Sequence, residues 1–234
     1  MAVITKNGYF GTPPTVANGL LMSLDAANPR SYVSGSTIWR DLSGNNKSGS
    51  LVSSSYDPTN GGGIVFNGTT SNFTFPTITV TNTYTLEIVG NITGPIDTTI
   101  ANRRTILGNN TNVSEINSTS NYFAGLTVDS STQNYNFGFA SAGSIVQNST
   151  FHWVFTLDSS KIVRMYFNGK STTSPDTQLT SFTTVTRTFN NFGVFGGARY
   201  YVGNLYIAKI YNRALTQTEV TQNYNATKVR FNIT

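Results

Sequence analysis

The sequence contains no cysteine, and this absence removes several kinds of chemistry at once. Disulfide frameworks, thiolate metal sites and cysteine nucleophiles are all excluded. The opening Met1–Lys6 lacks the apolar core of a secretory signal peptide, and no stretch approaches the roughly 20 apolar residues of a membrane helix. These absences favour a bacterial or viral protein of the cytoplasm that has no membrane partner.

Charged residues are also scarce, at 11% of the chain against about a quarter in an ordinary soluble protein. The formal net charge is +5, but the basic residues are scattered, and Arg103-Arg104 is the only adjacent basic pair. Because no run of five or more like charges occurs, the sequence predicts neither a nucleic-acid partner nor a polybasic membrane patch. Asn, Thr, Ser and Gly are abundant instead, which predicts a neutral, polar surface.

The ten acidic residues are dispersed, and no two of them lie within three positions of each other. Retaining glycosidases need two carboxyl groups about 5–5.5 Å apart, which alternate positions on one strand would supply. Only a pair from different strands could do so here, and Glu87 and Asp158 are the best candidates. His152 is the only histidine and has no nucleophile-elbow motif beside it, so we interpret it as a partly exposed strand residue. The sequence predicts no catalytic residues and a protein that is not an enzyme.

Short alternating apolar stretches predict a series of β-strands rather than helices. We expect strands near residues 19–25, 64–66, 73–75, 84–89, 151–157, 163–167, 192–197 and 202–211. Asn168-Gly169 predicts a tight hairpin, because both turn residues tolerate positive φ. The stretch 202–211 is apolar on both faces, which is typical of a central strand covered on both sides.

One helix is predicted near the end of the chain. Thr216 and Glu219 have the spacing of a capping box, and the helix should end near Asn223–Asn225. Residues 1–18 contain Pro13-Pro14 and are expected to form an extended arm, which packs back on the domain or reaches a neighbouring subunit. Many short strands, frequent turns and one helix predict a two-sheet sandwich.

The order of these landmarks resembles the laminin G-like branch of the concanavalin A-like lectin/glucanase superfamily. The matching segments are Phe66-Asn67-Gly68, Tyr84–Val89, Thr105–Gly108, Trp153–Asp158, Met165–Lys170, and Gly203 with Ile210–Glu219. The resemblance covers about residues 19–225. It implies that residues 19–234 form one laminin G-like domain, an all-β, two-sheet antiparallel jelly-roll sandwich with one short C-terminal helix.

The opening Gly19–Tyr32, with Trp39–Asn45, looks like the start of such domains in virion proteins of tailed phages. The resemblance implies a non-enzymatic phage virion structural protein, displayed on the particle as a capsid decoration or head-fibre module. Its partners would be capsid or fibre subunits and further copies of itself, and it would be assembled into the virion in the host cytoplasm. The alternatives are a carbohydrate-binding receptor-adhesion module of a tail fibre, which would bind host surface glycans, and a glycan hydrolase.

Three residues are candidates for carbohydrate binding: Trp39, Glu87 and Asn72. Trp39 could stack on a sugar or lie in the core. Glu87, on the strand face opposite Leu86, could mark a groove or pair with a neighbouring arginine.

Many domains of this branch hold Ca²⁺ at the rim of the sandwich, but the usual Asp-Asp is replaced here by Ser71-Asn72. The sequence therefore predicts no metal and no cofactor, with Ca²⁺ as the open alternative. Asp25 and Asp41 are the weak candidates for a calcium site, and their alternative role is hydrogen bonding within turns.

Overall fold

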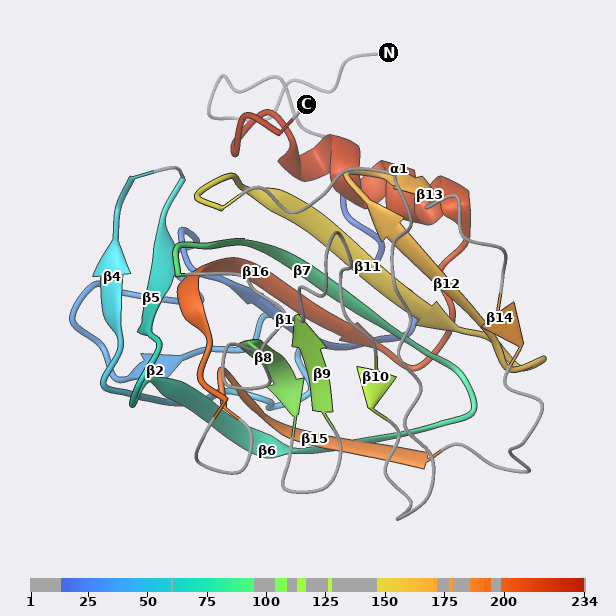
Figure 1. Cartoon of the computed structure of the whole chain (residues 1–234), viewed down its shortest axis with the longest axis horizontal. Helices are drawn as coiled ribbons and strands as arrows, with labels where there is room; N and C mark the ends of the chain where they lie inside the picture. The colour runs from blue at the N-terminus through green and yellow to red at the C-terminus, as the bar shows by residue number, and fades with distance from the viewer. Residues whose placement is uncertain are drawn as a thin grey trace.

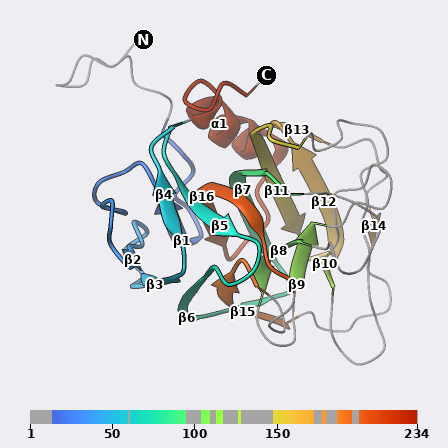
Figure 2. The same cartoon turned by 60° about the vertical axis from the view of Figure 1, so that its left-hand side comes forward.

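Two antiparallel sheets stacked face to face form the body of the protein (Figures 1 and 2). The structure is a computed structural model, and it describes residues 14–59, 61–94, 104–108, 113–116, 126–127, 147–171, 177–178, 186–194 and 199–233. The strands are β1 Leu20–Asp25, β2 Ile38–Trp39, β3 Gly49–Val52, β4 Ser55–Asp57, β5 Gly63–Asn67, β6 Asn72–Thr81, β7 Tyr84–Ile92, β8 Arg104–Gly108, β9 Val113–Ile116, β10 Leu126–Thr127, β11 Phe151–Leu157, β12 Ile162–Phe167, β13 Lys170–Ser171, β14 Thr177–Gln178, β15 Thr186–Phe192 and β16 Val202–Tyr211. Within the described ranges the only helix is α1, Gln217–Thr227. The predicted all-β sandwich with one short C-terminal helix is confirmed.

The strand β16 lies at the centre of a nine-stranded sheet with the order β13-β12-β11-β7-β16-β5-β4. It pairs with β7 along one edge, and with β5 and β1, placed end to end, along the other. Nearly every residue of β16 is buried, as are all of β7 and β11. The prediction of a central strand covered on both sides is therefore confirmed.

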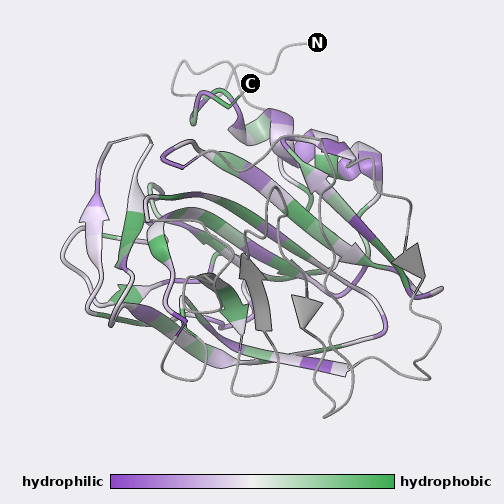
Figure 3. Cartoon of the chain, viewed as in Figure 1, coloured by the Kyte–Doolittle hydropathy of each residue, from purple (hydrophilic) through white to green (hydrophobic). Residues whose placement is uncertain are grey.

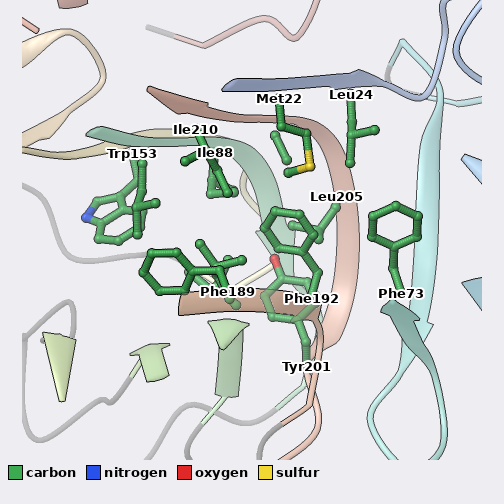
Figure 4. Packing of buried hydrophobic residues seen from close by; sticks show 14 of the residues in the cluster. Met22, Leu24, Phe73, Ile88, Trp153, Phe189, Phe192, Tyr201, Leu205 and Ile210 are labelled. Atoms are coloured by element: carbon green, nitrogen blue, oxygen red, sulfur yellow. The ribbon is translucent and has the colours of Figure 1, made fainter. Parts of the chain in front are cut away.

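A seven-stranded sheet, with the order β10-β9-β8-β15-β6-β3-β2, forms the second layer. Its inward side chains include Phe73, Phe189 and Phe192, which face Met22 and Leu205 of the nine-stranded sheet (Figure 4). The rings of Phe73 and Phe192 stack with their centroids 6.1 Å apart. Aromatic side chains thus fill the space between the sheets, because large flat rings bury much apolar area for each position.

The predicted turns form where the sequence places residues that accept positive φ. Asn168 and Gly169 have φ values of 48° and 76° and join β12 to β13 in a two-residue hairpin. Asp158 closes the preceding turn, accepting hydrogen bonds from the main-chain N–H groups of Ser160 and Ile162. The predicted hairpin turn at Asn168-Gly169 is therefore confirmed.

One strand was placed wrongly by the sequence pattern. The strand expected at 192–197 is β15, which begins at Thr186 and ends at Phe192. Gly193 has a φ of 90°, which takes the chain out of the extended conformation directly after Phe192. The rest of the expected strand, residues 195–197, lies outside the described residues.

The helix α1 covers the outer face of the nine-stranded sheet, on the side away from the seven-stranded sheet (Figures 1 and 2). The capping box is present as predicted, and the helix ends at Thr227, slightly later than expected. Figure 3 shows α1 largely hydrophilic and the strands beneath it largely hydrophobic. In the described part of the chain no helix is long and apolar enough to cross a membrane.

Two further segments lie beside α1 on the same outer face. Residues 14–18 pack against α1 and β16, so this part of the expected arm folds back on the domain. The rest of the arm, residues 1–13, lies outside the described residues. After α1, Phe231 and Ile233 pack against Tyr206 and Ile207 of β16.

Candidate functional site

Glu87 lies at the centre of a buried polar cluster on the outer face of the nine-stranded sheet, beneath α1. Its side chain is 0% exposed. One carboxylate oxygen, Oε1, lies 3.2 Å from Lys209 Nζ and 3.2 Å from His152 Nε2. The other, Oε2, accepts a hydrogen bond of 2.6 Å from Asn223 Nδ2 and lies 3.3 Å from the Tyr211 hydroxyl. Five side chains from β7, β11, β16 and α1 thus form one closed network.

The carboxylate of Glu87 is strongly stabilised in its charged form. Burial by itself would raise the pKa of Glu87, but the charge of Lys209 and the hydrogen bond from His152 hold this pKa at about 2. Burial and the charge of Glu87 raise the pKa of Tyr211, so its hydroxyl remains a donor. A general acid for glycoside hydrolysis needs a proton near neutral pH, which this environment withholds from Glu87.

Two sequence predictions about this cluster need correction. Glu87 does not mark a groove, because α1 and the surrounding strands cover it completely, and its partner is Lys209 rather than an arginine. His152 is not partly exposed: it is fully buried, its Nε2 faces Glu87 and its Nδ1 has no hydrogen-bond partner. Both predictions assumed a sheet with one solvated face, whereas this sheet is covered on both.

Trp39 also lies away from any surface where it could stack on a sugar. Its side chain is fully buried and packs edge-on against Phe73, with the ring centroids 5.4 Å apart. Trp39 is therefore a core residue. Asn72, the third candidate, is half-buried at the start of β6, and its role in ligand binding stays a prediction.

The two candidate calcium ligands are used by the fold itself. The Asp41 carboxylate accepts hydrogen bonds from the main-chain N–H groups of Ser23, Ser43 and Lys47. Asp25 accepts from the N–H of Ala27 and forms an ion pair of 2.8 Å with Arg230. A cation would have to displace these donors, so Asp25 and Asp41 do not fit a calcium site. Among the described residues, no three or more His, Cys, Asp or Glu side chains gather in a group that could hold a metal.

The other described carboxylates also have structural partners. Asp158 forms an ion pair of 2.7 Å with Arg164. Glu219 receives two hydrogen bonds from Arg213, and this contact joins the end of β16 to α1. Hydrogen bonds from Thr59 lower the pKa of Asp57. Each carboxylate whose side chain is described thus has its own local partner. None of these contacts brings two carboxylates together.

The exposed face of the seven-stranded sheet is largely polar over its described part, and its strand residues there are uncharged. Its outward polar side chains, which we call the threonine face, are Ser50, Asn72, Thr74, Thr79, Thr81, Thr186, Thr188 and Asn190, and the exposed apolar residues Ile38, Val52 and Pro76 lie among them. Thr81 and Thr186 are cross-strand partners with their hydroxyl oxygens 3.3 Å apart, and Thr79 pairs with Thr188. Hydroxyl and amide groups arranged on a regular strand surface can donate to and accept from a neutral polar ligand.

Sequence reasoning missed most partners of Glu87. Lys209, Tyr211 and Asn223 come from β16 and α1, more than 120 residues further along the chain. One signal was available: Lys209 is the only charged residue in a strand that is apolar on both faces. A lone base in such a strand needs a buried acid beside it, and Glu87 is its direct cross-strand partner.

The architecture defines a two-sheet jelly-roll sandwich whose described acidic residues are structural. A family model described as the concanavalin A-like lectin/glucanases superfamily matches residues 67–221, and the chain belongs to this superfamily. The fold expected from the laminin G-like resemblance is therefore confirmed. No curated protein matches the sequence significantly.

Solved structures with the same fold include both binding domains and parts of enzymes. Domain 4 of AbnA, an extracellular arabinanase from Geobacillus stearothermophilus solved with arabinotriose, is 20% identical, with a TM-score of 0.57, over 88% of this chain and 98% of that domain. The binding domain of Paraclostridial Mosquitocidal Protein 1 is 16% identical, with a TM-score of 0.66, over 90% of this chain and 52% of that one.

Trypanosoma rangeli sialidase is 14% identical, with a TM-score of 0.63, over 98% of this chain. The match covers 36% of the sialidase chain, so the present chain corresponds to about a third of that protein. At these identities the likeness is one of fold alone.

Proposed function

We propose that this chain is a non-enzymatic surface module, displayed on a phage virion as a capsid decoration or head-fibre module. The observation that carries the proposal is that every acidic side chain described has its own structural partner. Hydrolysis with retention or inversion needs two carboxyl groups on either side of one glycosidic bond. Glu87 and Asp158, the best candidates from the sequence, are held instead by Lys209 and by Arg164.

The virion location is supported by the resemblance of Gly19–Tyr32 and Trp39–Asn45 to the start of phage virion domains, and by the scarcity of charged residues, which make up 11% of the chain. The direct test is immuno-gold labelling of purified particles with an antibody against this chain, together with mass spectrometry of the particle proteins. We expect labelling of the head and a regular copy number for each particle. Particles that lack the chain would refute the proposal. Polysaccharide released by the pure protein, in a reducing-sugar assay, would refute its non-enzymatic part.

A carbohydrate-binding adhesion module is the second candidate, and the threonine face favours it. Flat arrays of hydroxyl and amide groups without charge suit neutral glycans, which offer the same groups in return. The fold of the arabinanase domain, which was solved with arabinotriose, agrees with such a role. Partners on a host cell would then be neutral surface glycans.

The threonine face can be tested by adding one long charged side chain to its centre. Thr79→Lys should abolish binding to any glycan that the wild-type chain retains on a glycan array. Thr218→Lys is the matched control, because Thr218 is exposed on α1, on the opposite side of the molecule. A glycan bound equally by both variants would place the binding surface elsewhere, and an array without signal, with and without Ca²⁺, would remove this candidate.

A further inference from the structure

Residues 14–18 lie on the domain as a short peptide held by the side chains of distant residues. Val16 donates its N–H to Asn223 Oδ1 over 2.8 Å, and its carbonyl lies 3.2 Å from the Tyr211 hydroxyl. Gln222 Nε2 donates to the Pro14 carbonyl over 2.6 Å, and Arg213 Nε donates to the Asn18 carbonyl over 3.0 Å. The groove that holds this peptide, which we call the segment groove, is formed by the end of β16 and by α1.

Recognition in the segment groove depends mainly on the main chain of the peptide. All four hydrogen bonds join a side chain of the groove to a main-chain N–H or C=O of residues 14–18. Val16 alone contributes a buried side chain, which packs in the apolar cluster of Val154, Leu215 and Val220. The groove therefore recognises one extended peptide with one apolar residue, and nothing in its contacts requires that the peptide belong to the same molecule.

A single tight turn connects this peptide to the rest of the domain. Leu20 donates its N–H to the Ala17 carbonyl over 3.1 Å, so residues 17–20 form a β-turn directly before β1. Gly19 has a φ of 77°, and a Cβ there would lie 2.7 Å from Asn212 Oδ1. Straightening this turn would join residues 14–18 and β1 into one extended segment. Residues 14–18 of each molecule could then make the same contacts in the segment groove of the other. A short turn of this kind is the usual hinge of segment exchange.

We propose that the segment groove of one copy binds residues 14–18 of a second copy, so that the chain forms oligomers by exchange of this segment. In one molecule the tether gives the segment an effective concentration in the millimolar range, so the closed form dominates in dilute solution. Copies held side by side on a particle reach similar local concentrations. Binding of a neighbour's segment then competes with binding of the molecule's own segment. The exchange itself does not depend on a virion role, because any dense array of copies would promote it.

Engineered cysteines can detect the exchange without interference, because the full chain has no native cysteine. Pro14→Cys and Gln222→Cys place thiols next to each other across the segment groove. The two single variants are mixed, unfolded and refolded together at micromolar and at millimolar concentration, and treated with a short bis-maleimide. We expect a covalent heterodimer that increases with concentration. Thr79→Cys, on the threonine face at the opposite side of the molecule, replaces Gln222→Cys as the control and should give little product.

Two further substitutions should move the dimer fraction in opposite directions. Gly19→Val disfavours the left-handed conformation of the closed turn and should increase the dimer on the order of tenfold at a given concentration. Val16→Asp places a charge in the apolar cluster and should abolish the dimer in both the cross-linking and sedimentation experiments. The proposal is overturned if no heterodimer forms at any concentration, and cross-links appear only within single molecules of the Pro14→Cys/Gln222→Cys double variant. It is equally overturned if Val16→Asp leaves the heterodimer unchanged.

Discussion

Replacing Glu87 by Gln removes the one negative charge from the network beneath α1. The Lys209 ammonium, 4% exposed, then remains buried without its counter-ion. Leaving one partner of a buried ion pair uncompensated costs about 3–5 kcal/mol, out of a total folding free energy of about 5–15 kcal/mol. We expect Glu87→Gln to lower the free energy of unfolding by that amount, because the Gln amide keeps the shape of the side chain but not its charge.

Urea denaturation followed by tryptophan fluorescence measures this change, since both Trp39 and Trp153 are buried and report on unfolding. Asp158→Asn is the matched control. It neutralises the Asp158–Arg164 pair, whose side chains are 24% and 32% exposed, and a pair of that kind contributes only about 0.2–1 kcal/mol. The Asn side chain also keeps an oxygen for the turn N–H groups of Ser160 and Ile162.

The double variant Glu87→Gln/Lys209→Met separates the loss of the pair from the loss of one charge. Replacing the whole buried pair by uncharged side chains should recover most of the stability that Glu87→Gln loses. The reasoning is refuted if Glu87→Gln costs no more than Asp158→Asn. It is also refuted if the Lys209→Met change makes the Glu87→Gln variant still less stable.

Three further outcomes follow from the same contacts. Because the pKa of Glu87 falls from 4.5 to about 2 on folding, its contribution to stability is complete above pH 4.5 and is lost as the pH falls toward 2. This loss amounts to about 3 kcal/mol. Urea titrations should show the free energy of unfolding of the wild type falling by about 3 kcal/mol more than that of Glu87→Gln over this pH range. Gly203→Ala should prevent folding or lower the unfolding midpoint sharply, as judged by circular dichroism, because its Cβ would overlap the Asn91 carbonyl oxygen and its φ is 145°. Thr216→Ala removes half of the capping box with Glu219 and should cost about 1 kcal/mol in urea denaturation, and an unchanged midpoint would contradict that role.

The local features of the fold were predictable because their causes are local. The Asn168-Gly169 hairpin follows from two adjacent residues that tolerate positive φ, and α1 begins where Thr216 and Glu219 satisfy each other's main-chain groups. The central position of β16 follows from its apolar residues on both faces. Each of these signals lies within about ten residues of sequence, so a single sequence suffices to read it.

The environment of Glu87 depends on contacts that the local pattern does not contain. On β7 alone, Glu87 looks like the solvated side of an alternating strand. Only when α1 and residues 14–18 cover the outer face does that side become an interior, and the hydrogen bonds of Asn223 to Glu87 and of Val16 to Tyr211 span more than 120 residues of sequence. The same covering layer explains why His152 is buried although its strand alternates.

The two outer faces of the sandwich therefore have different physical roles. The outer face of the nine-stranded sheet is sealed by α1, by residues 14–18 and by Phe231 and Ile233, and its buried charges stabilise the fold instead of meeting a ligand. The threonine face has no such cover in the described structure and presents hydroxyl and amide groups to solvent. If copies are joined through the segment groove, the joined side is the sealed one, because the groove lies beside α1. The threonine face of every copy then stays accessible, so assembly and recognition can proceed on opposite sides of the same domain.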